Sequence, residues 1–157
     1  GRVLFTQYRK HYAPKSTPLS EATIEKRIET TIGGVPVVGY IDIIRKGEET
    51  PVVADYKFVN RTKSIADVEK GLQLGVYALA EGIRQVEFLC FVKTKTPKIE
   101  RVKSGRTQES LDKVVRVFQG VSQAIKSGVF PFCSPDSWKC CQKFCGVWEH
   151  CPQGGKK

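Results

Sequence analysis

The sequence contains no methionine, no long apolar run and no secretory leader pattern. A helix that crosses a bilayer needs about 18 or more consecutive apolar residues, and no run in this chain approaches that length. A long Lys/Arg run and an amphipathic basic helix are also missing, so a membrane anchor is not expected. Because the chain begins Gly-Arg and has no methionine, we expect a fragment that lacks an upstream element.

Acidic residues are the scarcer charge. The 157 residues include 26 Lys and Arg against 16 Asp and Glu, which gives a net charge of +10. A surface with this excess favours polyanions, nucleic acid first and an acidic membrane second. The alternative is a basic surface that is simply solvated, and the total charge alone does not separate the two.

The composition, 40% hydrophobic and 27% charged, is typical of a globular protein with one real core. The chain has no internal repeat and no low-complexity tract. We expect an N-terminal arm and connector at 1–22, a core at 23–128 and a cysteine-rich tail at 129–157.

Apolar periodicity predicts the order of the elements. Alternation predicts three strands joined by short turns, at 23–32, 35–45 and 51–59. Apolar steps of three and four predict a helix from Ser64 to Ile83 and another at about 107–127. Between them the sequence predicts two strands, at 86–94 and 98–103. This order predicts an α/β fold with a mixed sheet, an antiparallel meander followed by a βαβ-type return, flanked by helices.

Two carboxylates and a lysine interrupt the apolar strands. Asp55 and Lys57 are two residues apart, so they share one face of a strand. If the turn at 46–50 registers the strands suitably, Asp42 meets Asp55 on that face. Two close carboxylates repel unless a cation lies between them, and a hard divalent ion such as Mg²⁺ or Mn²⁺ suits them. The alternative is a structural ion pair on the sheet.

Three motifs in order resemble the PD-(D/E)XK nuclease superfamily, and within it the RecB-like branch. They are Gly39-Tyr40-Ile41-Asp42, Asp55-Tyr56-Lys57 and Gln73-Leu74-Gly75-Val76-Tyr77. The branch includes nucleases of CRISPR adaptation, AddB-type recombination proteins and phage-type exonucleases. The resemblance spans about residues 23–151. It implies a restriction-endonuclease-like core that hydrolyses DNA phosphodiesters with Mg²⁺ or Mn²⁺.

The resemblance also implies roles for individual residues. Asp42, Asp55 and the backbone carbonyl of Tyr56 would bind the metal, and Lys57 would position or activate the attacking water. Gln73 and Tyr77, at i and i+4 on one helix face, would support the site or contact DNA; a polar helix edge is the alternative.

Further ligands are less clear. Glu25 is a candidate metal ligand because the family often places an acidic residue before the G-x-x-D motif, and Glu29 competes for this place. RecB-like members tend to use an upstream histidine, but the chain has only His11 and His150, and His11 has no motif around it.

Five of the six cysteines lie in the tail. A local cluster suggests a bound metal better than a disulfide framework does. Cys140, Cys145 and Cys151 resemble the cysteine trio that holds a [4Fe–4S] cluster in some RecB-like nucleases, with Cys133 or Cys141 as a fourth ligand. Zn²⁺ is the chemical competitor, and free thiols are the third alternative. Cys90, in a predicted buried strand, is expected to be a core residue.

Basic and aromatic residues flank the proposed site. Phosphate contacts are expected from Arg61, Lys63, Lys93 and Lys95, with Lys46 and Lys98 as further candidates, and base stacking from aromatics such as Tyr40. We therefore predict a DNA exonuclease of recombination or repair. It would act on linear duplex ends or single strands, in a bacterial cytoplasm or encoded by a phage, with recombination proteins as candidate partners. The alternative is a nuclease-like DNA-binding module that does not cut.

Overall fold

The computed structural model describes residues 2–12, 22–129, 133, 137 and 139–151. The chain divides into two compact units, Gly1–Gly120 and Val121–Lys157. The first contains the sheet and most of the helices. The predicted segment boundary at 128 stays a prediction.

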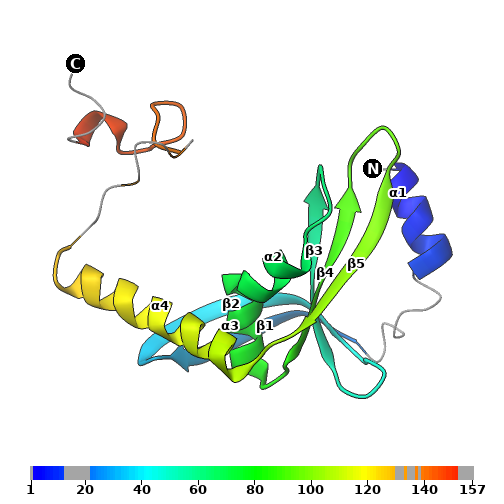
Figure 1. The fold of residues 1–157 in the computed structure, drawn as a ribbon, viewed down its shortest axis with the longest axis horizontal. Helices are drawn as coiled ribbons and strands as arrows, with labels where there is room; N and C mark the ends of the chain where they lie inside the picture. The colour runs from blue at the N-terminus through cyan, green and yellow to red at the C-terminus, as the bar shows by residue number, and fades with distance from the viewer. Residues whose placement is uncertain (1, 13–21, 130–132, 134–136, 138, 152–157) are drawn as a thin grey trace. The chain divides into compact units, whose positions relative to one another are not determined.

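Five strands form one sheet in the order β1-β2-β3-β4-β5. They are β1 (Thr23–Ile32), β2 (Val35–Arg45), β3 (Val52–Val59), β4 (Gln85–Val92) and β5 (Lys98–Gly105). Neighbours are antiparallel except β3 and β4, which run parallel and are joined by a helical crossover. The predicted mixed α/β sheet, a meander with a parallel return, is confirmed. Figure 1 shows β3 and β4 pointing the same way, so the loops that follow them leave from the same end of the sheet.

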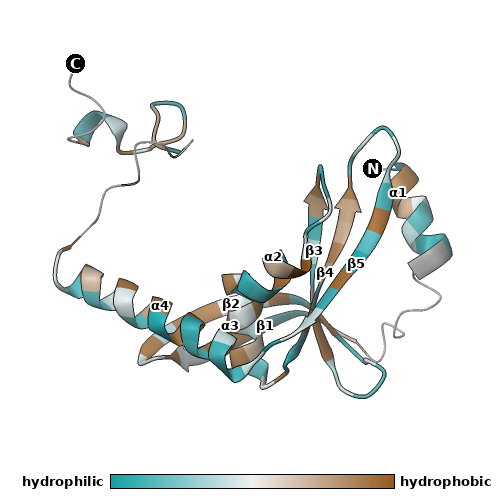
Figure 2. Ribbon diagram, viewed as in Figure 1, coloured by the Kyte–Doolittle hydropathy of each residue, from teal (hydrophilic) through white to brown (hydrophobic). Residues whose placement is uncertain are grey.

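The two faces of the sheet bury different clusters. Buried residues such as Ile41, Val53 and Cys90 pack with helical residues such as Leu74 into the main core. The opposite face holds a smaller cluster of Leu4, Leu89, Phe91 and Ile99. The short N-terminal helix α1 (Arg2–Gln7) supplies Leu4, and Gln7 Nε2 donates to the Pro97 carbonyl at 3.1 Å. In Figure 2, β4 is brown along most of its length, as expected for a strand buried on both faces.

The predicted helix at 64–83 is two helices, α2 (Ile65–Lys70) and α3 (Leu72–Glu81). Ser64 and Asp67 form a capping box at the start of α2. Gly71 has φ −60° and ψ 114°, which ends the helical ladder there. Apolar periodicity continues through the break, which is why the sequence pattern did not show it.

A buried arginine explains why the chain breaks at Gly71. Arg106 is 3% exposed, and its guanidinium donates to the carbonyls of Val68, Glu69 and Gly71. These are carbonyls at the end of α2, which need partners from outside the helix. Arg106 therefore fixes the junction from which α3 starts.

The glycine inside the Gln73–Tyr77 motif makes room for this arginine. A Cβ on Gly75 would lie closer than 3.0 Å to both Arg106 Nη2 and Val114 Cγ2. Val114 belongs to α4 (Gln108–Lys126), whose buried residues Leu111 and Val114 join the main core. Gly75 thus lets Arg106 and α4 approach α3.

Two short helical elements complete the fold. The π-helix η1 (Tyr8–Tyr12) follows α1, and the 3-10 helix η4 (Trp148–His150) lies in the second unit. None of the described helices is both long enough and apolar enough to cross a bilayer.

Gly75→Ala should destabilise the protein by about 1–3 kcal/mol, the usual cost of overpacking a filled core. The free energy of unfolding can be measured by urea denaturation. Gly120→Ala is the matched control, because Gly120 is also helical but a Cβ there meets nothing within 4 Å. That variant should be more stable by about 0.5–1 kcal/mol. Equal losses in the two variants would contradict the assignment of Gly75 to close packing.

Candidate active site

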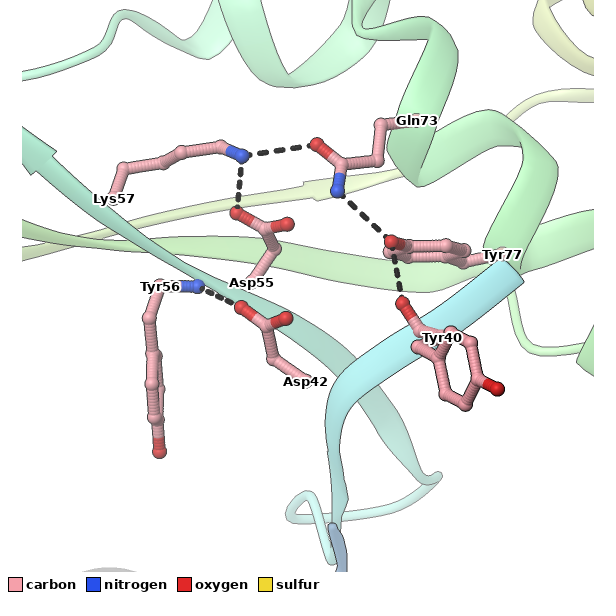
Figure 3. A network of polar contacts seen from close by, with 7 residues as sticks. All are labelled: Tyr40, Asp42, Asp55, Tyr56, Lys57, Gln73 and Tyr77. Carbon is pink, nitrogen blue, oxygen red and sulfur yellow. Dashed lines mark hydrogen bonds and ion pairs between the residues drawn. The ribbon is translucent and has the colours of Figure 1, made fainter. Parts of the chain in front are cut away.

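The candidate site lies where β2 parts from β3. In the described part of the chain their pairing ends at Ile43 and Ala54. Beyond this point the backbone N–H of Tyr56 finds no carbonyl on β2. Asp42 Oδ2 accepts it instead, at 2.8 Å. The side chain of Asp42 thus replaces a missing rung of the sheet and is held beside β3 (Figure 3).

A chain of hydrogen bonds then runs from β2 through α3 to β3. Tyr77 Oη donates to the Tyr40 carbonyl at 2.7 Å, a second backbone group of β2 near the point where the strands part. Gln73 Nε2 donates to Tyr77 Oη at 2.8 Å, and Lys57 Nζ donates to Gln73 Oε1 at 2.9 Å. Lys57 Nζ also lies 2.7 Å from Asp55 Oδ2. Figure 3 shows this chain end to end.

Asp55 is buried, at 1% exposed. Desolvation raises the pKa of its carboxyl, the charge of Asp42 raises it further, and the hydrogen bond and charge of Lys57 oppose the rise. Burial also raises the pKa of the Tyr77 hydroxyl, against the hydrogen bond with Gln73. The site therefore holds a carboxylate in a place that disfavours its negative charge.

The carboxylates suit a divalent cation. Asp55 Oδ2 is buried, and its partner among the described residues is the Lys57 ammonium, 2.7 Å away. One ammonium balances only one of the two neighbouring carboxylates, so a bound cation would relieve the cost of burying their negative charge. Oxygen ligands from one or two carboxylates are what Mg²⁺ takes in proteins. Asp42 and Asp55 therefore fit the metal that the sequence predicts.

The described residues bring no third metal ligand to Asp42 and Asp55. They include no group of three or more His, Cys, Asp or Glu side chains that could hold a metal ion. In the β1–β2 register Glu25 is opposite Asp42, between the pairs Ile24–Ile43 and Lys26–Ile41. Its backbone has a φ of 49°, unusual for a residue with a long side chain, and its side chain is exposed. Glu29 pairs with Arg27 instead.

The other predicted DNA contacts lie around the site. Tyr40 is 54% exposed on β2. Arg61 and Lys63 follow β3, and Lys93 and Lys95 follow β4, at the same end of the sheet. Tyr56 points away from Asp55 and Lys57, onto the other face of the sheet (Figure 3).

One neighbour of the site was missed by the sequence analysis. Tyr8, from η1, lies with its hydroxyl 3.5 Å from that of Tyr56, and its ring packs on Phe91 at 5.8 Å. Burial, followed by the hydrogen bond with Tyr8, raises the pKa of Tyr56. The apolar and aromatic residues at 4–12 could have suggested a segment that packs on the sheet, but no sequence pattern names its partner.

The cysteines of the second unit occupy a series of turns. Cys145 N–H donates to the Cys141 carbonyl at 2.9 Å, and Cys151 N–H to the Trp148 carbonyl at 3.3 Å. None of the five tail cysteines forms a disulfide bond in the part of the chain described, and the pKa of the Cys140 thiol is raised by desolvation and then by the charges of the other four. They lie near one another but are not arranged as a metal-binding group. Cys90 is buried in β4, as expected for a core residue.

A model of the PD-(D/E)XK nuclease superfamily matches residues 2–152. The chain belongs to this superfamily. The match spans the sheet, the polar network and nearly all of the tail, and it confirms the nuclease family that the three motifs predicted. No curated protein matches the sequence.

Solved structures share the fold of this PD-(D/E)XK chain. The crystal structure of SSO0001 has a TM-score of 0.57 and 17% identity, over 97% of this chain and 68% of that one. A protein from Eubacterium rectale named as a putative exonuclease has a TM-score of 0.59 and 13% identity, over 91% of this chain and 57% of that one. At these identities the likeness shows the fold.

Asp55→Asn should make the protein more stable near pH 7 by about 0.5–2 kcal/mol, as is common when a strained functional group is removed. The pKa of Asp55 is higher in the folded state than its value near 3.8 in the unfolded state. Its contribution to the free energy of unfolding is therefore fully present below the unfolded pKa and is lost as the pH rises through the folded pKa. The advantage of the variant should therefore shrink as the pH falls. Urea denaturation over a pH series measures it.

Asp67→Asn provides a control of opposite sign. Hydrogen bonds from the backbone and side chain of Ser64 lower the pKa of Asp67. The contribution of Asp67 to stability is therefore present above its unfolded pKa of 3.8 and is lost as the pH falls through its folded pKa. This variant should be less stable than the parent near pH 7. Parallel pH profiles for the two variants would contradict the environment assigned to Asp55.

Proposed function

We propose that this chain is a metal-dependent DNA nuclease of the RecB-like branch, which hydrolyses phosphodiester bonds as an exonuclease. The observation that supports this best is the continuous polar network from Asp55 through Lys57 and Gln73 to Tyr77, with Asp42 beside it. A structural ion pair alone would not need the two helix residues that hold the lysine.

In this proposal Asp42 and Asp55, with the Tyr56 carbonyl, hold Mg²⁺ or Mn²⁺, and Glu25 is a further candidate ligand. The bound metal would acidify a water and neutralise charge on the phosphate. Asp42 is fixed by the Tyr56 N–H, so its position does not depend on a flexible side chain alone. Preorganised ligands lower the cost of reaching the reactive geometry.

Lys57 would position the attacking water and stabilise charge that develops on the phosphate. Its ammonium is held from two sides, by Asp55 Oδ2 at 2.7 Å and Gln73 Oε1 at 2.9 Å. It is still 30% exposed, so a third N–H can point toward a substrate. Tyr77 and Gln73 act through Lys57 and are positioning residues.

The exonuclease assignment and its setting extend beyond the family. The Q-x-x-x-Y motif is typical of exonuclease and helicase-associated members, and one structural neighbour is named as an exonuclease. We infer that the substrate is linear DNA, at duplex ends or as single strands. The role we infer is recombination or repair, with recombination proteins as partners. The net charge of +10 supports a polyanionic substrate.

We further propose that the tail cysteines hold a [4Fe–4S] cluster that fastens the tail, with Zn²⁺ as the alternative. Cys140, Cys145 and Cys151 would be ligands, and Cys133 or Cys141 the fourth. The mutual influence of these thiols on Cys140 supports their proximity. Thiols must lose their protons to bind a metal, so a bound metal would lower the pKa of Cys140, which is raised in its absence.

A nuclease assay on end-labelled linear DNA tests the main proposal. The protein should release nucleotides with Mg²⁺ or Mn²⁺ and not with EDTA, and closed circular DNA should resist. Lys57→Ala should lower the rate about 100-fold or more, because it removes a preorganised electrostatic group. Lys113→Ala is the control, since Lys113 also forms an ion pair, with Glu109, but on α4, which carries no residue of the network. DNA binding without cleavage by the parent protein would instead support the non-cleaving module.

Metal analysis and visible absorbance of the purified protein test the tail. A [4Fe–4S] cluster predicts a brown protein with bound iron, and Cys145→Ser should lose both. Cys90→Ser should keep the colour, because Cys90 is buried in β4 and belongs to the core. A colourless protein with bound zinc would contradict the cluster and support Zn²⁺. A protein without iron or zinc would contradict both and support free thiols.

A further inference from the structure

We propose that Phe58 is a stacking platform for an unpaired base of the DNA substrate, so that the enzyme takes a single-stranded terminus. This inference rests on the proposed nuclease function and deepens it.

Phe58 has one covered and one open ring face. It stacks on Phe91 with centroids 4.8 Å apart and planes at 16°. Phe91 is buried and also contacts the rings of Tyr8 and Tyr56, so the lower ring of the pair cannot move freely. Phe58 itself is 63% exposed. A base added to the open face would extend an existing aromatic stack.

Basic residues surround this end of the sheet. Phe58 and Phe91 are register partners on the parallel strands β3 and β4, and the loops after both strands begin within two residues. The Lys93 N–H donates to the Val59 carbonyl at 2.7 Å, which ties the two loops together. Arg61, Lys63, Lys93 and Lys95 lie on these loops, and none forms an ion pair within the described residues. An anionic backbone beside an aromatic platform is the arrangement that binds single strands.

Phe58 and the candidate active site lie on opposite faces of the part of β3 that β2 no longer pairs with. Phe58 follows Lys57 directly, so the two side chains point to opposite faces of β3. Past Ala54 the edge of β3 that faces β2 has no strand partner in the part of the chain described. In Figure 1 the ends of β3, β4 and β5 rise away from β1 and β2. A single strand bound at Lys57 can cross this open edge and place its next base on Phe58.

The chemistry of the platform selects unpaired DNA. Bases inside a duplex are already stacked on each other and show no free face, whereas an unpaired base gains by stacking on an aromatic ring. Stacking is also tolerant of sequence, because every base has a π-face. We therefore expect a preference for single-stranded ends without a preference for their sequence.

Binding is measured in a Lys57→Ala background, where cleavage does not interfere, by fluorescence anisotropy of labelled oligonucleotides. Phe58→Ala should weaken binding of single-stranded DNA about tenfold and leave a blunt duplex of equal length within twofold. Phe58→Tyr should restore the affinity. Phe5→Ala is the matched control: Phe5 is 62% exposed on α1 and should change nothing.

An abasic single strand distinguishes stacking from an indirect effect. It keeps the phosphates but has no bases, so Phe58→Ala should not weaken its binding. If Phe58→Ala weakens the normal and abasic strands equally, or weakens neither, the proposal is wrong; no effect on either would indicate a surface for a protein partner. Single-stranded RNA of the same sequence reports whether the sugar matters.

Charge substitutions test the neighbouring loops separately. Lys93→Gln and Lys95→Gln should each reduce the slope of log affinity against log salt by about 0.7, the value for one phosphate contact on a single strand. Phe58→Ala should leave the slope unchanged. Because these measurements need no cleavage, they can succeed if the nuclease activity is absent, and they can fail while the nuclease assay succeeds.

Discussion

The separation of β2 from β3 after Ile43 and Ala54 is the constraint on which the candidate site depends. Separated strands leave backbone N–H and C=O groups without ladder partners, and such groups must find others when they are buried. The Tyr56 N–H takes Asp42, and the Tyr40 carbonyl takes Tyr77. The side chains of Asp42 and Tyr77, both in the family motifs, are thus fixed by the end of the pairing between β2 and β3.

The position of α3 follows from a second constraint, the buried guanidinium of Arg106. It binds the last carbonyls of α2 and so sets the start of α3, while Gly75 leaves it the space to do so. Gln73 and Tyr77 then reach Lys57 and the Tyr40 carbonyl from the helix side. The polar network is therefore supported from the core as well as from the sheet, which suits a site that must hold a charged lysine in one place.

The electrostatics of the site oppose stability and favour binding of a cation. Asp55 is buried and its pKa is raised, although the Lys57 ammonium lies 2.7 Å from its Oδ2. Lys57 compensates this carboxylate only in part, because desolvation raises the pKa of Asp55 by more than the contact with Lys57 lowers it. Natural proteins retain such arrangements where function requires them, since an apolar residue in the same place would be more stable.

The sequence by itself determined the order of the elements along the chain, the meander with its parallel return, and the motif residues. Alternation at 23–59 and the period of two that places Asp55 and Lys57 on one face are local properties of the chain. It could not show the break at Gly71, because apolar spacing continues across it and the cause is Arg106, 35 residues later. Nor could it show that Asp42 replaces a rung of the sheet or that Tyr8 meets Tyr56, since both depend on contacts between distant segments. Local periodicity selects the elements, but only tertiary packing decides which polar groups lose their partners and which side chains replace them.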